Sequence, residues 1–453
     1  MAKLVGKRRE KSHGRRRGRL ERREPDARHP VGLNREGSPS RGASSTRVGG
    51  LRLALVVLVA LRIGLGIVAF VAVSFGPRAG SIVGQWEELV LRGTDLWSKL
   101  LSPWQRWDAL WYQHIAENGY AAGDGSTAFF PLYPLLSRIV SVPLLGNVVL
   151  AELLVSSAAF AAAMWLLYRL ARLDSASIDT GSVAADRTAG SRVALPVPQL
   201  AVLLTALFPV GFFLLAPYTE GLFLALTLAS FWFARTNRPW AAGAAGFFAS
   251  LTRAHGIFLA LPLAFEYLRQ RDVFPWILGR GGRRPGLGVL ASGLPALGLL
   301  ATMAYQRAIV GVQGSALETY AQWGYQVVAP WRAIAASWND IRAGGPHGNV
   351  PEIEALNLAC LLAFSALAVV AARRLPVAYA LFALPYAALL LTHEGWLSPL
   401  MSTSRFVLPL FPCFIVVAVW LARRPRLAVG WLGVSALLQL LLFQFWVRWG
   451  FVA

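Results

Sequence analysis

Residues 51–75 read LRLALVVLVALRIGLGIVAFVAVSF, an apolar run interrupted only by Arg52 and Arg62. A helix of this length spans the ~30 Å hydrocarbon core of a bilayer. Further runs long enough to cross, or nearly cross, lie at 146–168, 199–216, 218–234, 287–310, 354–372, 376–392, 405–422 and 427–446. The sequence therefore predicts an all-α polytopic membrane protein.

The composition agrees with this fold class. Of the 453 residues, 56% are hydrophobic and only 15% are charged, which argues against a soluble multidomain enzyme. The two cysteines, Cys360 and Cys413, lie inside apolar runs, so a disulfide scaffold, a zinc ribbon and a haem motif are excluded.

The segment 239–268 decides the helix count. As one helix it would place the arginines that follow it outside the cell, against the positive-inside rule. A split at Thr252-Arg253 into two short membrane helices returns the chain to the cytosol. This reading predicts about eleven membrane helices.

Charge fixes the predicted sides of the membrane. The tail 1–50 holds 15 basic and 5 acidic residues, and the predicted cytosolic side collects 32 of the 44 basic residues. We expect the tail to be disordered and cytosolic, with adhesion to anionic lipid as an alternative. It has no aromatic residue to stack on a base, so no nucleic-acid partner is expected.

The long polar loops are predicted to lie on the opposite side of the membrane from the basic tail. The long loops 76–145 and 311–353 are predicted to be extracytoplasmic and to carry interfacial helices, within a transmembrane domain of 51–446 that ends in a short segment, 447–453. Function should therefore lie on the outer face. We expect a multi-pass protein of a bacterial plasma membrane, or of the ER membrane in a eukaryote.

The first outer loop carries WQRWDALWYQHIAENGY over residues 104–120. A helix over 105–117 would place Asp108, Trp111, Tyr112 and Ile115 on one face, with a glycine as the stop. A carboxylate among aromatic rings at the membrane surface suits a general base. The alternative is an interfacial helix whose aspartate caps it or pairs with Arg106.

A second block, AFFPLYPLL, follows at 128–136. Its two prolines argue against a regular helix, so we expect a bent segment at the membrane interface. It serves either as a loop anchor or as the wall of a groove for a lipid-linked substrate.

Ionisable groups in the spans are costly and mark candidate sites. They are Arg62, Glu152, Glu220, Arg253 with His255, Arg307 and Arg405. Several lie near the outer ends of their spans, where two arginines would suit a phosphate. Snorkelling side chains or structural ion pairs are the alternative.

Motifs for other chemistry are missing from the sequence. It contains no His-Glu-x-x-His, no Walker loop and no dinucleotide-binding glycine pattern, so we expect no metal and no cofactor. A multi-pass lipid or solute transporter and a non-catalytic assembly subunit remain alternatives to an enzyme.

The runs Arg106–Ala109, Ile115–Tyr120 and Phe129–Leu135 together resemble the PIG-V mannosyltransferases, within the GT-C class of membrane glycosyltransferases. Weaker likenesses follow at 217–220, 250–256 and 404–412. The likeness extends over about 51–446.

The resemblance implies a GT-C-like fold, with Asp108 as the catalytic carboxylate. It implies a mannose or related sugar donor on a polyprenyl or dolichyl phosphate, and a glycan or glycolipid acceptor in the membrane lipid environment. One departure is His255, where relatives often have a small residue. The predicted substrate-binding residues are Arg106, Trp107, Trp111, Tyr112, Phe130, Pro131, Tyr133, Glu220, Arg253, His255 and Arg405.

Overall fold

The computed structural model describes residues 41–76, 86–178, 195–308, 311, 324–345, 350–395 and 397–452. Contacts divide the chain into Met1–Ser45 and Thr46–Ala453, and the second unit carries the fold. Most of the predicted basic tail, residues 1–40, lies outside the described residues, as does much of the second predicted outer loop.

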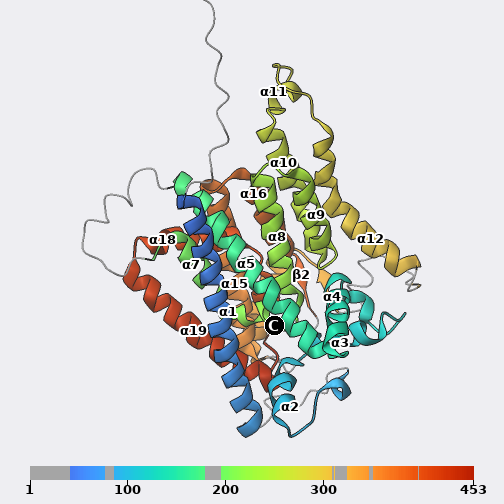
Figure 1. Ribbon diagram of the computed structural model, residues 1–453. Helices are drawn as coiled ribbons and strands as arrows, with labels where there is room; N and C mark the ends of the chain where they lie inside the picture. Colours follow the sequence, from blue (N-terminus) through green and yellow to red (C-terminus); the bar gives the residue numbers. More distant parts are fainter. Residues whose placement is uncertain are drawn as a thin grey trace, which may run out of the picture. The chain divides into compact units, whose positions relative to one another are not determined.

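Helices dominate the described residues (Figure 1). The α-helices are α1 (Arg41–Phe75), α2 (Leu96–Leu101), α3 (Asp108–Asn118), α4 (Leu132–Ser141), α5 (Val148–Ile178), α7 (Val197–Ala206), α8 (Thr219–Arg235), α9 (Pro239–Ser250), α10 (Ala260–Gln270), α11 (Phe274–Ile277), α12 (Leu294–Ala308), α14 (Pro330–Ala343), α15 (Pro351–Arg374), α16 (Val377–Leu390), α17 (Thr403–Phe406), α18 (Phe411–Ala422) and α19 (Pro425–Val447). Short 3-10 segments are η1 (Glu87–Leu89), η2 (Ser102–Trp104), η3 (Ser126–Ala128), η4 (Val142–Leu144), η5 (Gly211–Leu214), η6 (Ala254–Leu259) and η7 (Leu287–Gly293).

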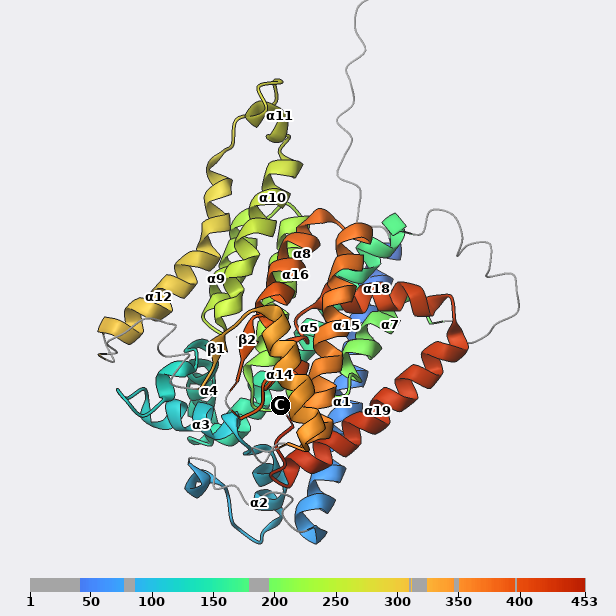
Figure 2. The same cartoon turned by 180° about the vertical axis from the view of Figure 1, so that it is seen from behind.

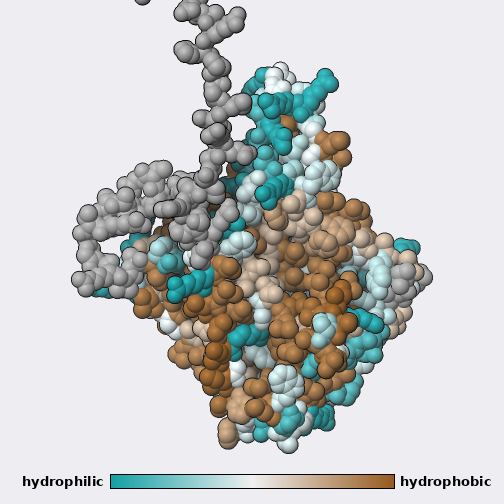
Figure 3. Space-filling view, viewed as in Figure 1, coloured by the Kyte–Doolittle hydropathy of each residue, from teal (hydrophilic) through white to brown (hydrophobic). Residues whose placement is uncertain are grey.

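Five helical stretches in the described part of the chain are long and apolar enough to cross a membrane. They are Gly49–Phe75, Val148–Asp174, Leu287–Ala308, Pro351–Arg374 and Pro425–Val447. Apolar side chains cover much of the face in Figure 3, whereas polar residues gather around α11. The prediction of an all-α membrane protein fits these helices, and the count of eleven spans stays a prediction.

Some of the predicted spans are not single α-helices. The run 405–422 is not one helix, because α17 ends at Phe406 and α18 begins only at Phe411. Pro409 and Pro412 lie at this break, and a proline lacks the N–H that a helix interior needs. The run 199–216 likewise holds the short helix α7 followed by η5.

The break at Thr252-Arg253 is confirmed. Helix α9 ends at Ser250, and after η6 the chain continues as α10. The side-chain amide of Gln270, at the end of α10, donates to Ala234 O near the end of α8 at 2.9 Å. The end of α10 therefore lies beside the end of α8, so α9 and α10 together run away from that end of the helix bundle and back to it.

The block 128–136 was predicted to lack a regular helix, and this is wrong. Helix α4 begins at Leu132, with Pro131 as its N-cap and Pro134 in its first turn. The first turn of a helix has no intrahelical partners for its N–H groups, so proline is tolerated there.

A two-stranded antiparallel sheet was not predicted from the sequence. Strand β1 (Gln326–Val327) pairs with β2 (His393–Glu394), with Gln326 opposite Glu394. Figure 2 shows both strands beside α14. The pairing joins the second loop to the connection between α16 and α17.

Candidate active site

Four charged side chains from four separate elements form one ionic network. Arg405 Nη1 lies 2.7 Å from Asp108 Oδ2. Arg405 Nε lies 3.6 Å from Glu220 Oε1, and Arg253 Nη1 donates to that same oxygen at 2.6 Å. The order of the network is therefore Asp108, Arg405, Glu220, Arg253.

Burial differs along this network. The Glu220 side chain is only 1% exposed, whereas those of Arg253 and Arg405 are 12% and 10% exposed. Asp108 is 26% exposed, the most of the four. The carboxylate at the end of the network is thus the one that a solvent-borne hydroxyl group reaches most easily.

Local backbone geometry presents Asp108. The residue begins α3, three positions later than predicted, because Trp107 has φ 56° and ψ −119°. Positive φ is costly for a bulky residue and is often retained at functional sites. A carboxylate in the first turn is also stabilised by the helix dipole.

Tyr218 buttresses the start of α3. Its hydroxyl donates to Arg106 O at 3.1 Å and accepts from Asp108 N at 3.3 Å. The Arg405 guanidinium carbon lies 5.2 Å from the centre of the Tyr218 ring. Tyr218 therefore contacts both members of the Asp108–Arg405 pair, a role that sequence reasoning missed although its neighbour Glu220 was selected.

Asp108 pairs with Arg405, whereas Arg106 contacts other groups, so the Arg106 pairing named in that alternative is not observed. Its guanidinium donates to the carbonyl oxygens of Val447, Ser102 and Gln105 at 2.7, 2.6 and 3.0 Å. It also lies 4.6 Å from the Trp449 ring. These contacts fasten the loop before α3 to the end of α19, so Arg106 has a structural role here.

Trp107 faces the same C-terminal segment. Its ring lies 5.2 Å from that of Phe451 and 6.1 Å from that of Trp449. Trp449 and Phe451, which belong to the segment predicted only as a short C-terminal end, thus support the residue that precedes Asp108. No local pattern in the sequence could reveal this contact.

The aromatic face of α3 is confirmed as a cluster. Trp111, Tyr112 and Ile115 pack with Phe129 and Tyr133. Rings of Trp111 and Phe129 stack at 5.2 Å between centroids. Burial raises the pKa of Tyr112, so its hydroxyl stays protonated.

This cluster contacts the network through Thr219. The hydroxyls of Tyr112 and Thr219 are 3.4 Å apart, and Arg253 Nη1 lies 3.4 Å from the threonine oxygen. Phe130 and Pro131 are half-buried just before α4. The backbone there is tied to the α9–η6 turn, because Leu132 N donates to Leu251 O at 3.0 Å.

His255 does not enter the ionic network. Its ring instead packs 4.7 Å from that of Tyr386 and 6.3 Å from that of Phe406. Arg62, another charge in a span, donates to Ser157 Oγ and to the carbonyls of Leu153 and Leu215. Arg62 is therefore engaged in helix packing.

The second loop adds a residue that sequence reasoning missed. Partial burial raises the pKa of Tyr325, while the nearby Arg405 opposes the shift and Asp108 adds to it. Tyr325 directly precedes β1, so the β1–β2 pairing places it beside the network. Within the described ranges, no group of three His, Cys, Asp or Glu side chains is placed to hold a metal ion.

Residues 90–271 match the family model described as Mannosyltransferase (PIG-V). This part of the chain is similar to the PIG-V mannosyltransferase family. The matched region contains Asp108, Glu220 and Arg253, whereas Arg405 lies beyond it. The match supports a glycosyltransferase role, and the apolar helices fit a multi-pass integral membrane protein. No curated protein matches the chain.

Proposed function

We propose that this PIG-V-like protein is an inverting glycosyltransferase that moves mannose, or a related sugar, from a polyprenyl or dolichyl phosphate to a glycan or glycolipid on the extracytoplasmic face. The observation that carries the proposal is the network of Asp108, Arg405, Glu220 and Arg253. It combines one accessible carboxylate with two guanidinium groups, which are the groups that such a transfer requires.

Asp108 is the proposed general base. Its ionised carboxylate takes the proton from the incoming acceptor hydroxyl, whose oxygen forms the new bond to the anomeric carbon. The bond from that carbon to the phosphate oxygen breaks, and its electron pair stays on the phosphate. The products are the glycoside, the lipid phosphate and protonated Asp108, with the sugar configuration inverted.

Arg253 and Arg405 are the proposed phosphate ligands. Negative charge grows on the leaving phosphate oxygen, and guanidinium groups already fixed in place stabilise it without reorganising. Glu220 holds both arginines through one oxygen, Oε1, which supports a positioning role for it. The rings of Trp111 and Phe129 stack on each other and are buried, so they brace α3 beside the network.

The test compares wild type and Asp108→Asn in lipid nanodiscs with radiolabelled polyprenyl-phosphate mannose and a lipid and glycan extract. We expect the variant to lose at least 100-fold in transfer while it still binds the donor, because general-base catalysis contributes 10²–10⁴-fold. Arg253→Glu should instead weaken donor binding.

Glu117→Gln is the matched control, since it removes an exposed carboxylate from the other end of the same helix. Its transfer rate should equal that of wild type. Near-normal transfer by Asp108→Asn would disprove the base assignment. If wild type neither binds the donor nor moves label, the same assay with other lipid-linked sugars tests the choice of mannose.

A further inference from the structure

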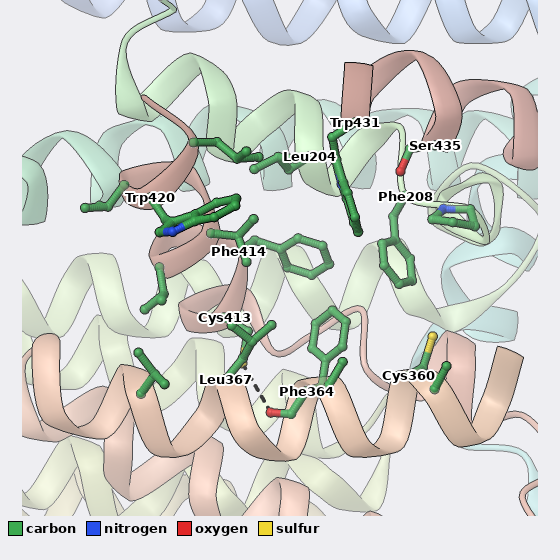
Figure 4. Close-up of a pocket in the computed structure, with 18 of the residues that line it drawn as sticks. Leu204, Phe208, Cys360, Phe364, Leu367, Cys413, Phe414, Trp420, Trp431 and Ser435 are labelled. Atoms are coloured by element: carbon green, nitrogen blue, oxygen red, sulfur yellow. Dashed lines mark hydrogen bonds between the residues drawn. The ribbon is translucent and has the colours of Figure 1, made fainter. Parts of the chain in front are cut away.

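A large apolar groove lies between α7, α15, α18 and α19, away from the ionic network. Its volume is about 920 Å³, at the upper end of the ~300–1,000 Å³ range of ligand clefts. Figure 4 shows Phe364 and Leu367 of α15 on one side, Phe414 and Trp420 of α18 beside them, and Trp431 of α19 on the other. The walls are almost entirely hydrophobic.

The groove exists because α19 diverges from its neighbours. One polar anchor pins the C-terminal half of this helix, where the Gln439 amide donates to Ala206 O at 2.9 Å and to Phe208 O at 3.1 Å. Towards its N-terminus, Trp431 and Val434 stand across the groove from α15 and remain more than half exposed. Hydrocarbon therefore has access to the wedge.

Three arginines line one end of the groove. Arg374 ends α15, and Arg423 and Arg424 follow α18. All three are exposed, and no carboxylate of the described residues forms an ion pair with Arg374 or Arg423. The Arg424 guanidinium lies 4.4 Å from the Trp420 ring, at the boundary between the charged end and the apolar walls.

This charged end is remote from Asp108. Glu354, near the start of α15, accepts from Leu400 N, close to Arg405. Arg374 lies at the other end of the same helix, roughly 30 Å away at 1.5 Å per residue. The groove and the ionic network therefore share no residue.

We propose that the groove binds one anionic phospholipid of the bilayer, with an acyl chain in the wedge and the phosphate against Arg374, Arg423 and Arg424. An apolar slot that ends in arginines matches both halves of such a lipid, and basic pockets between membrane helices bind anionic head groups. The lipid fills the wedge beside α19, so it stabilises that helix. This site is additional to the proposed transferase site.

The experiment titrates the delipidated full-length protein in detergent with phosphatidylglycerol that carries brominated acyl chains, which quench nearby tryptophans. We expect saturable quenching that Trp431→Phe reduces. A triple variant with Arg374→Gln, Arg423→Gln and Arg424→Gln should need a roughly hundredfold higher concentration of phosphatidylglycerol for half-maximal quenching. Brominated phosphatidylcholine should bind wild type as weakly as phosphatidylglycerol binds this triple variant.

Arg373→Gln with Arg426→Gln is the matched control, because both residues are exposed neighbours outside the groove lining. Ala363→Trp fills the groove and leaves the arginines intact, so it should abolish the quenching. Equal binding of the two lipids, or an unaffected triple or Ala363→Trp variant, would overturn the proposal. Displacement of phosphatidylglycerol by a lower concentration of polyprenyl phosphate, or a second protein copy that covers α19, would also overturn it.

Discussion

Glu220 is the residue on which the ionic network depends. Its Oε1 contacts both arginines, while its Oε2 is buried and accepts no hydrogen bond from the residues that the structure describes. A carboxylate that is 1% exposed survives in such a place only because it is paired. The same pairing keeps Arg253 and Arg405 close together in spite of their mutual repulsion.

Glu220→Gln should therefore destabilise the protein. The amide keeps the shape of the side chain but removes its charge, which leaves two mostly buried arginines without their shared counter-ion. Loss of one partner of a buried pair costs about 3–5 kcal/mol. Thermal unfolding in nanodiscs measures the effect, with Glu117→Gln as the control, and an unchanged melting temperature would contradict the role given to Glu220.

At the scale of the elements, the α9–η6 turn sets the position of Arg253. Gly256 lies so close to the end of α9 that a Cβ atom there would meet Ser250 N and Oγ, each at 2.5 Å. The atoms that it would meet include backbone, which cannot rotate away as a side chain can. A glycine is therefore needed to close the turn.

Gly256→Ala should open this turn and move Arg253. Overpacking of this kind costs about 1–3 kcal/mol, so both the melting temperature and the affinity for the donor should fall. Gly430→Ala is the control, because a Cβ on that α19 glycine meets nothing within 4 Å. If Gly256→Ala has the melting temperature and the donor affinity of wild type, the turn accommodates a Cβ atom and the argument is refuted.

At the scale of the whole molecule, the β1–β2 pairing brings the second loop to the site. His393 in β2 is 4% exposed, and its ring lies 5.9 Å from that of Tyr325. Burial lowers the pKa of His393, although hydrogen bonds to the backbone of Met401 and Leu390 oppose the shift. The folded protein therefore holds this imidazole neutral, within the β1–β2 pairing that connects the second loop to the site.

Acid should destabilise the folded protein through His393. In the unfolded chain His393 has a pKa near 6.5, so below about pH 6.5 the unfolded state binds a proton that the folded state does not. Stability should fall with decreasing pH in this range, by up to ~1.4 kcal/mol per pH unit. Melting curves of wild type and His393→Gln between pH 7.5 and 5 test this, and equal slopes would refute it.

Several features followed from the sequence because they depend on neighbouring residues alone. Apolar runs of sufficient length predicted membrane helices, and the positive-inside rule located the break at Thr252-Arg253. The aromatic face of α3 followed from helical spacing. Asp108 was a candidate for the same reason, as a carboxylate among rings.

Only the tertiary structure decided what each charge contacts. The sequence offered Arg106 as the neighbour of Asp108, but packing turns Arg106 towards Val447 and brings in Arg405 from far along the chain. Hydrophobic patterns specify which face of a helix is buried, and they carry no information about which distant helix covers it. The ionic network, the support from the C-terminal segment and the groove beside α19 all arise from such distant contacts.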